Sequence, residues 1–274
     1  MTFKEHLGFF LRSFFLQTGW NYQKYQNLGL FFVMWPFVKK LYRQNEEAIP
    51  SVVGRYLATF NTQPVLASFC IGALARQEQL VAQAKDLETS GEEILEWNAI
   101  KQGLSITTAS IGDRLFWGTL KPLTLFLALF VWLLLGVHIF EIQPNETVSL
   151  LNMFVGCAVA FFTFNTIALF VKWEGIQISY HTEPSACFGL TKFDWNRTIY
   201  NAKKIGLLVT IGLILLGAYY HLRDYLTVLD VQFVTRATII VCFIGISFLT
   251  RRLRIPNVYL YLSAVAVFNL LCYL

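Results

Sequence analysis

The stretch "VSLLNMFVGCAVAFFTFNTIALFV", residues 148–171, decides the fold class of this 274-residue chain. It carries no charge, and a bilayer core of about 30 Å needs roughly 20 apolar residues in a helix. Four other stretches of similar character lie in the C-terminal part, at 120–140, 205–222, 231–249 and 255–274. The sequence therefore predicts an all-α integral membrane protein in which residues 120–274 form about five transmembrane helices.

The composition agrees with a lipid environment. Hydrophobic residues make up 55% of the chain and charged residues 14%, whereas a soluble domain has about 25% charged residues. The formal net charge is +5, but no long basic run is present, which argues against nucleic-acid binding. The excess of positive charge fits membrane topology better.

The short loops between the expected spans predict their orientation, because cytoplasmic loops are enriched in Lys and Arg. Residues 141–147 contain neither, 172–204 contain five, 223–230 contain only Arg223, and 250–255 contain three. This alternation places the N-terminal region in the cytoplasm and the C-terminus on the opposite side.

The first 119 residues form a separate predicted region. Their apolar segments 7–17, 28–38 and 65–75 are about 11 residues long and too short to span a bilayer. They could be interfacial, re-entrant or buried against a partner, and 76–103 is the most polar stretch of the chain. We therefore expect a helical region at 1–119, cytoplasmic or interfacial, followed by the transmembrane region at 120–274.

The titratable residues predict no cofactor, metal or catalytic constellation. The five cysteines form no CxxC pair, and the four histidines are scattered along the chain. No nucleophile with a nearby base, and no phosphate-binding loop, stands out.

Three separate motifs follow one another along the chain: "FLRSFFLQTGWNYQKYQNLGL" at 10–30, "TFNTQP" at 59–64 and "SIGDRLFWGTLKP" at 110–122. In this order they resemble the IID subunits of the mannose/fructose/sorbose-type sugar phosphotransferase systems. The resemblance covers most of 8–122 and continues weakly to "RRLRIPNVYLYL" at 251–262, which looks like the family's basic loop before its final span.

The resemblance implies a non-catalytic membrane subunit of a sugar permease in the bacterial cytoplasmic (inner) membrane. Such a subunit pairs with a IIC membrane subunit, commonly in trimers of IIC–IID pairs. The pair takes up a hexose or amino sugar, which IIB phosphorylates after IIA has charged it. Two alternatives stay open: a degenerate IID with a scaffolding, sensing or receptor role and no transport, and a membrane enzyme built around Asp113.

Asn61, Thr62 and Gln63 are the first candidates for substrate binding or path lining. Pro64 suits the first turn of a helix, with Asn61 or Thr62 as its cap. A cap requires only one such side chain, however, and amides offer the donors and acceptors that sugar hydroxyls need.

Asp113, Trp20 and Asn21 complete the candidates. Asp113 precedes the first expected span, where it could cap a helix, line the translocation path, or do both. Trp20 and Asn21 read as an interfacial anchor, with sugar stacking on Trp20 as the weaker alternative. The run at 9–15 suggests an amphipathic helix on the membrane or the IIC partner, with Arg12 at the headgroups.

Overall fold

A computed structural model describes residues 1–83, 87–138 and 146–225, and these ranges contain helices and no named strand. The first helices are α1 (Phe3–Ser13), α2 (Asn27–Leu41), the short η1 (Glu46–Ala48), α3 (Ile49–Leu57) and α4 (Ala67–Gln83). They are followed by α5 (Leu87–Gly112), the π-helical segment η2 (Asp113–Leu120), α6 (Lys121–His138), α7 (Glu146–His181), η3 (Pro184–Lys192) and α8 (Trp195–Tyr225). The helical fold class predicted from the sequence is thus confirmed.

Three helical stretches in the described ranges are long and apolar enough to cross a membrane: Gly91–Leu135, Leu150–His181 and Pro184–Tyr219. They contain most of each of the spans expected at 120–140, 148–171 and 205–222. The spans expected at 231–249 and 255–274, with the basic loop between them, lie outside the described residues. The chain forms two compact units, Met1–Leu213 and Ile214–Leu274, and only the end of α8 is described in the second.

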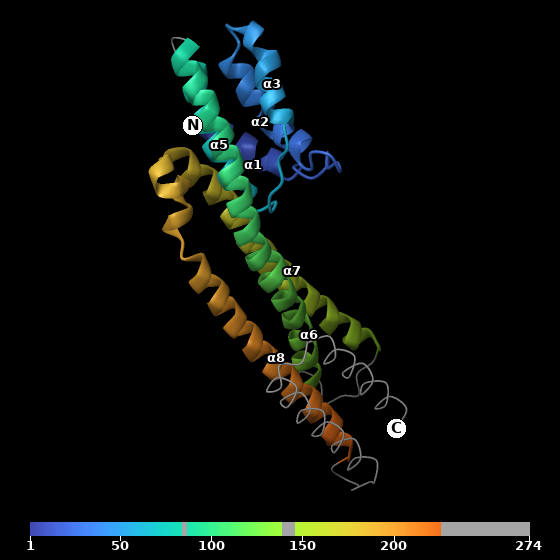
Figure 1. Ribbon diagram of the computed structural model, residues 1–274. Helices are drawn as coiled ribbons and strands as arrows, with labels where there is room; N and C mark the ends of the chain where they lie inside the picture. The colour runs from blue at the N-terminus through green and yellow to red at the C-terminus, as the bar shows by residue number, and fades with distance from the viewer. Residues whose placement is uncertain (84–86, 139–145, 226–274) are drawn as a thin grey trace. The chain divides into compact units, whose positions relative to one another are not determined.

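The chain does not break where the N-terminal region was expected to end. α5, η2 and α6 follow one another without interruption, and Figure 1 shows them as one long helix with α2 and α3 beside its N-terminal half. The division at 119/120 stays a prediction about what lies in the membrane. It is not visible as a gap between elements.

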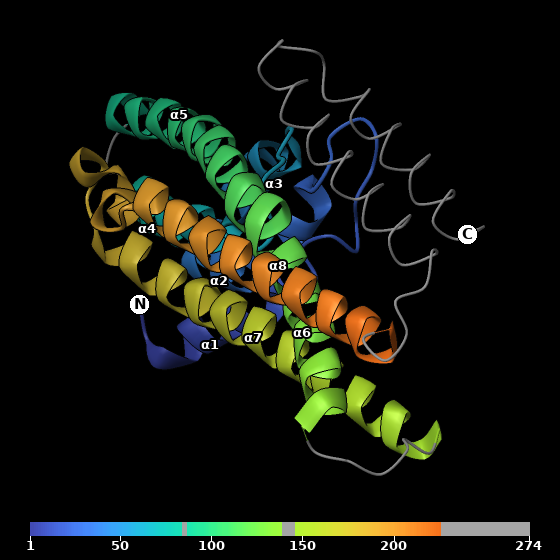
Figure 2. The ribbon, with the colours of Figure 1, turned by 90° about the horizontal axis from the view of Figure 1, so that it is seen from below.

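α4 is the centre of this unit. Its residues from Ala67 to Ala75 are all buried, and Figure 2 shows α4 between α5 and α7. A helix that is apolar on every side is stable only when other elements surround it. The apolar segment 65–75 is therefore shielded by the chain's own helices.

Small residues let α4 and α7 approach closely. Ser68 and Gly72 on α4 meet Gly175 and Ser179 on α7. A Cβ atom at Gly72 would overlap the carbonyl oxygen of Ile176 and the hydroxyl of Ser179, and one at Gly175 would overlap Ser68. Pairs of small residues four positions apart are the usual means of close helix contact in membranes. The same device joins α6 and α7, where a Cβ at Gly156 would lie 2.5 Å from the carbonyl oxygen of Ala128.

α1 is attached to α7 through polar contacts. The ammonium group of Lys172 donates to the carbonyl oxygen of Ser13, 3.2 Å away, at the C-terminal end of α1. That end carries the negative partial charge of the helix dipole, so a cation is stabilising there. His6 Nε2 lies 3.0 Å from the carbonyl oxygen of Trp173, and the rings of the two residues are in tilted contact, with centroids 4.0 Å apart.

We predict that Gly72→Ala destabilises the protein, because the added methyl group meets the backbone of α7, which cannot move without separating the helices. Overpacking of this kind costs about 1–3 kcal/mol. The matched control is Gly54→Ala in α3, where a Cβ has no neighbour within 4 Å. Thermal unfolding of the full chain in detergent should show a lower midpoint for Gly72→Ala and an equal or higher one for the control. Equal midpoints for both variants would contradict this packing.

Candidate functional site

The TFNTQP motif lies against the loop that contains the first motif. Tyr25 and Phe60 form a parallel β-bridge, the backbone N–H of Gln26 donates to the carbonyl oxygen of Phe60 at 2.8 Å, and that of Phe60 donates to Lys24 at 3.3 Å. The buried side chain of Gln26 extends this pairing. Its amide donates to the carbonyl oxygen of Thr62 at 2.8 Å and accepts from the N–H of Thr62 at 3.0 Å.

On its other side, the segment 58–63 runs along α5. Lys101 donates to the carbonyl oxygen of Ala58 at 3.1 Å, the hydroxyls of Thr62 and Thr108 are 2.7 Å apart, and Gln63 packs on Gly112. Five residues of extended chain and three turns of α-helix both cover about 16 Å. The segment 58–63 can therefore contact α5 at successive positions from Lys101 to Gly112. The three motifs, distant in sequence, therefore meet along 58–63.

Gln63 is the residue that begins the turn into α4. Its side-chain oxygen accepts from the N–H groups of Val65 at 2.7 Å and Leu66 at 3.0 Å. The expectation that Asn61 or Thr62 would cap this helix is wrong, because Thr62 is engaged by Gln26 and Thr108 and Asn61 points to solvent. The hydrogen bonds of the buried Gln63 side chain within the described residues are made by its oxygen and not by its amide nitrogen.

Asn61 is exposed and opens into a polar hollow of about 630 Å³ between the segment 58–63 and α5. The polar side chains that line the hollow besides Asn61 are those of Thr59, Asn98, Lys101, Gln102 and Ser105. The α5 residues are not among the site candidates identified from the sequence. Their spacing of three and four positions places them on one face of a helix, but this pattern is hard to recognise because most of the stretch 76–103 is polar.

Asp113 does not cap a helix. It lies at the start of η2, inside the continuous run from α5 to α6, so no free N–H groups are present for it to bind. Its exposed carboxylate has no hydrogen-bond or ion-pair partner in the described ranges. The eight residues of η2 have the wider π-helical geometry, which is often found at functional sites. Its role as a path-lining residue stays a prediction.

Asn21 and Trp20 have different surroundings. The side chain of Asn21 accepts from the N–H of Lys24 at 2.8 Å and donates to Asn27 at 2.8 Å, so it holds the loop together. Trp20 is exposed and packs edge-on against Tyr22, with ring centroids 4.8 Å apart. Of the two, only Trp20 presents its side chain outward.

A buried ion pair between Glu78 and Arg55 lies close to the start of the segment 58–63. The carboxylate of Glu78 on α4 accepts from Arg55 at 2.6 Å, from the Tyr42 hydroxyl at 2.8 Å and from the Tyr56 hydroxyl at 2.9 Å. Burial, reinforced by the nearby carboxylate, raises the pKa of both tyrosines. The sequence does not single out Glu78, because it lies within the polar stretch 76–103, which suggests an exposed helix.

Trp97 of α5 completes this cluster. Two cations lie over its ring, the guanidinium carbon of Arg55 at 5.4 Å and the ammonium nitrogen of Lys101 at 5.5 Å from the ring centre. Lys101 also donates to the carbonyl oxygen of Arg55 at 2.8 Å, near the C-terminal end of α3. The cluster therefore fixes the end of α3, from which the segment 58–63 departs.

We predict that Glu78→Gln lowers the free energy of unfolding by about 3–5 kcal/mol, because it leaves the buried guanidinium of Arg55 without a counter-charge. Glu47→Gln removes an exposed carboxylate from η1 and should change stability by less than about 0.5 kcal/mol. Denaturation of the purified chain, followed by tryptophan fluorescence, measures both. A Glu78→Gln protein as stable as the unaltered chain would show that the ion pair contributes nothing.

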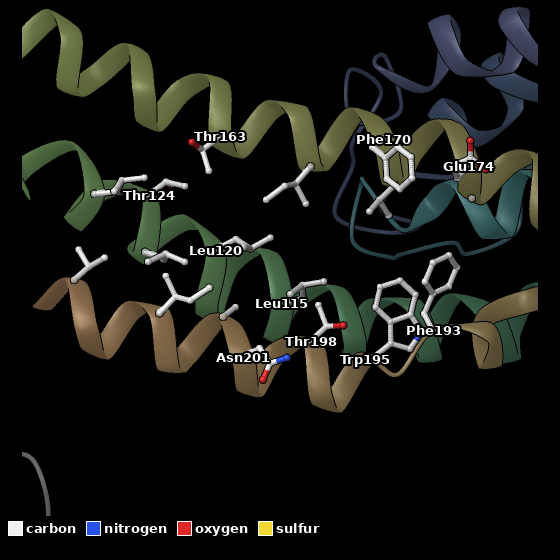
Figure 3. Close-up of a pocket in the computed structure, with 18 of the residues that line it drawn as sticks. Leu115, Leu120, Thr124, Thr163, Phe170, Glu174, Phe193, Trp195, Thr198 and Asn201 are labelled. Atoms are coloured by element: carbon white, nitrogen blue, oxygen red, sulfur yellow. The ribbon is translucent and has the colours of Figure 1, made fainter. Parts of the chain in front are cut away.

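A second cavity, of about 550 Å³, lies between α4, η2, α6, α7 and α8. Figure 3 shows Leu115, Leu120 and Phe170 among its lining, with Thr124, Thr163, Glu174, Thr198 and Asn201 as polar groups at separate points. Its walls are otherwise apolar, so it suits a sugar less well than the hollow beside Asn61. No group of three or more His, Cys, Asp or Glu residues in the described part of the chain is placed to hold a metal ion.

Comparison with known proteins gives a consistent result. Residues 1–140 match a family model described as the PTS system mannose/fructose/sorbose family IID component, where PTS denotes the phosphotransferase system. The mannose-specific EIID component of Escherichia coli (strain K12) is 31% identical over 180 residues, covering 66% of this chain and 56% of that protein. The fructose permease IID component of Bacillus subtilis (strain 168) is 33% identical over 184 residues, covering 66% and 57%.

Two solved structures are similar as well. One is a cryo-EM structure of the mannose transporter ManYZ in complex with microcin E492, with 28% identity, a TM-score of 0.50 and coverage of 78% of this chain and 70% of that chain. The other, described as the structure of a membrane protein, has 27% identity and a TM-score of 0.56 with the same coverage. The chain spans little more than half the length of the curated relatives it matches.

Proposed function

Because the chain belongs to the IID components of the mannose/fructose/sorbose family of the phosphotransferase system, as its motifs predicted, we propose that it is the non-catalytic membrane subunit of a sugar permease. It acts with a IIC subunit in the uptake of a hexose or amino sugar, which IIB phosphorylates. The observation that carries this proposal is the meeting of the three motifs along residues 58–63, with the polar hollow beside them.

Within this function, Asn61 contacts the sugar or lines its path. Its amide is exposed in a hollow whose other polar groups include two amides and a hydroxyl, from Asn98, Gln102 and Ser105. Sugar hydroxyls both donate and accept hydrogen bonds, so amides match them at each position. Gln63 and Asp113 do not line the hollow itself. In this proposal Asp113, exposed at the start of η2, lines a further part of the path, and buried Gln63 contributes by setting the turn beside Asn61.

Thr62, Asn21 and Trp20 have supporting roles in this proposal. Thr62 is held by Gln26 and Thr108, so it positions Asn61 and does not turn toward a ligand. Asn21 shapes the loop that pairs with the segment. Trp20 anchors that loop at the membrane interface or against the IIC subunit. Exposed Trp rings are enriched at both kinds of interface, because the ring is apolar and its N–H group is polar.

The proposed setting is the inner membrane of a bacterium, with residues 1–119 cytoplasmic or interfacial and the C-terminus on the opposite side. Three helices of spanning length support the membrane location, and the distribution of Lys and Arg in the loops supports the orientation. Assembly with IIC as trimers of pairs, and phosphate transfer from IIA to IIB, follow from the family and need no catalytic residue in this chain.

We predict that Asn61→Ala lowers sugar uptake about tenfold, the effect of losing one or two hydrogen bonds to a polar ligand. Cells that express the chain with its IIC, IIB and IIA partners would be given a panel of radiolabelled hexoses and amino sugars. Gln177→Ala, an exposed amide on α7 away from the hollow, should leave uptake unchanged. Co-purification with IIC tests assembly separately.

Two results would change the proposal. Normal uptake by the Asn61→Ala variant would remove Asn61 from the site while leaving the transport function in place. If the unaltered chain supports uptake of none of the sugars although it assembles with IIC, the scaffolding, sensing or receptor role becomes the better interpretation.

A further inference from the structure

A cleft between α1 and α2 has basic side chains at its rim and apolar ones at its floor. Its volume is about 460 Å³. Lys4 and Arg12 of α1 and Lys40 of α2 supply the cations, and Phe9 and Phe37 are among the apolar residues. The cleft is separate from the hollow beside Asn61 and has no part in the proposed sugar path.

Lys4, Gly8 and Arg12 form one stripe along α1. Residues four positions apart lie on the same face of a helix, so Lys4 and Arg12 stand about 12 Å apart along the axis with Gly8 midway between them. A Cβ at Gly8 would have no neighbour within 4 Å. The stripe therefore holds two cations on either side of an open space above the helix backbone.

Lys4 and Arg12 have no counter-charge in the cleft. Its one carboxylate, Glu5, is 2.7 Å from Lys40 and also accepts from the N–H of Thr2. Although burial alone would raise the pKa of Glu5, these bonds outweigh it and lower the pKa, which keeps the carboxylate engaged. No ion-pair partner for Lys4 or Arg12 occurs in the described ranges, so the cleft carries an excess of two positive charges.

Arg12 is held in place while most of its donors stay free. Pro36 lacks an N–H and so leaves the carbonyl oxygen of Phe32 without its helical partner. Arg12 Nη1 lies 3.5 Å from that oxygen, and the guanidinium carbon lies 5.3 Å from the centre of the Phe32 ring. The remaining guanidinium N–H groups have no partner in the described part of the chain and can receive an anion.

An exposed apolar face adjoins the stripe. Phe3, Leu7 and Leu11 each precede one residue of the stripe, and Phe3 is 72% and Leu11 53% exposed. Phe14 and Phe15, which directly follow α1, are 49% and 52% exposed. An exposed apolar face beside a basic one is the pattern of a helix that lies in the membrane interface.

We propose that this cleft binds the phosphate of an anionic phospholipid, whose acyl chains lie against the exposed apolar face of α1. The two uncompensated cations select an anion, and the gap above Gly8 gives the phosphate room between them. The adjoining apolar face favours a lipid over a soluble phosphate, since the chain is a membrane protein and cations near a membrane surface attract anionic lipids.

Native mass spectrometry of the full chain in a neutral detergent tests this proposal. The chain is titrated with dioleoylphosphatidylglycerol or with the zwitterionic dioleoylphosphatidylcholine, and bound lipid is counted. We expect the anionic lipid to bind more tightly. Lys4→Gln and Arg12→Gln should each weaken its binding about fivefold, the effect of one cation near a membrane surface. Gly8→Leu should weaken it too, by filling the gap without changing the charge.

Lys39→Gln is the matched control, because Lys39 is exposed on α2 and does not line the cleft. It should leave binding unchanged. Equal binding of the two lipids, or an equal loss with Lys39→Gln, would overturn the proposal in favour of general surface charge. Displacement of the lipid by an equal concentration of glycerol 3-phosphate would also overturn it, as the acyl chains would then contribute nothing. Thermal unfolding of each variant establishes that α1 still packs on α2.

Discussion

The close contact between α4 and α7 is the constraint on which the rest of the described fold depends. Between helices in lipid there is little hydrophobic driving force, so association relies on close packing and on hydrogen bonds. Gly72 and Gly175 provide that packing, because the backbone of α7 passes where a side chain at Gly72 would stand, and the side chains of Ser68 and Phe69 occupy the space above Gly175. Through this contact the short N-terminal helices are joined to a helix of spanning length, and α4 is placed where α5 can cover its other side.

The position of α4 determines the path of the segment 58–63 and which of its side chains are exposed. The segment 58–63 enters α4 through Gln63 and must lie along α5, where Thr108 and Gly112 receive it. Most of its polar groups are used in holding this position, as are those of Gln26 and Asn21. The exposed side chain of Asn61 has no such partner among the described residues, and its exposure beside the polar hollow follows from the engagement of its neighbour Thr62. The site and the packing of the fold are therefore parts of one arrangement.

Individual residues show how far the sequence could be read. The spans expected at 148–171 and 205–222 lie within α7 and α8, because length and apolarity suffice to predict a helix that lipid can surround. For the segments 28–38 and 65–75, the sequence is compatible with interfacial, re-entrant and partner-buried positions. They contribute to α2 and α4 and pack within the chain itself, which their length alone could not reveal. The capping roles assigned to Asn61, Thr62 and Asp113 were wrong, because a cap depends on where a helix begins and on which side chain is free to turn back.

The sequence by itself determined the helical class, the membrane environment and, through three motifs in order, the family. These follow from the composition, from the length of the apolar segments and from the identity of the motif residues, all of which are properties of the linear sequence. Only the tertiary structure decided that the motifs meet along residues 58–63, that Glu78 is buried with Arg55 and two tyrosines, and that Asn98, Gln102 and Ser105 share a hollow with Asn61. Such contacts join residues tens of positions apart, and they form only once glycines and small side chains have set how closely the helices pack.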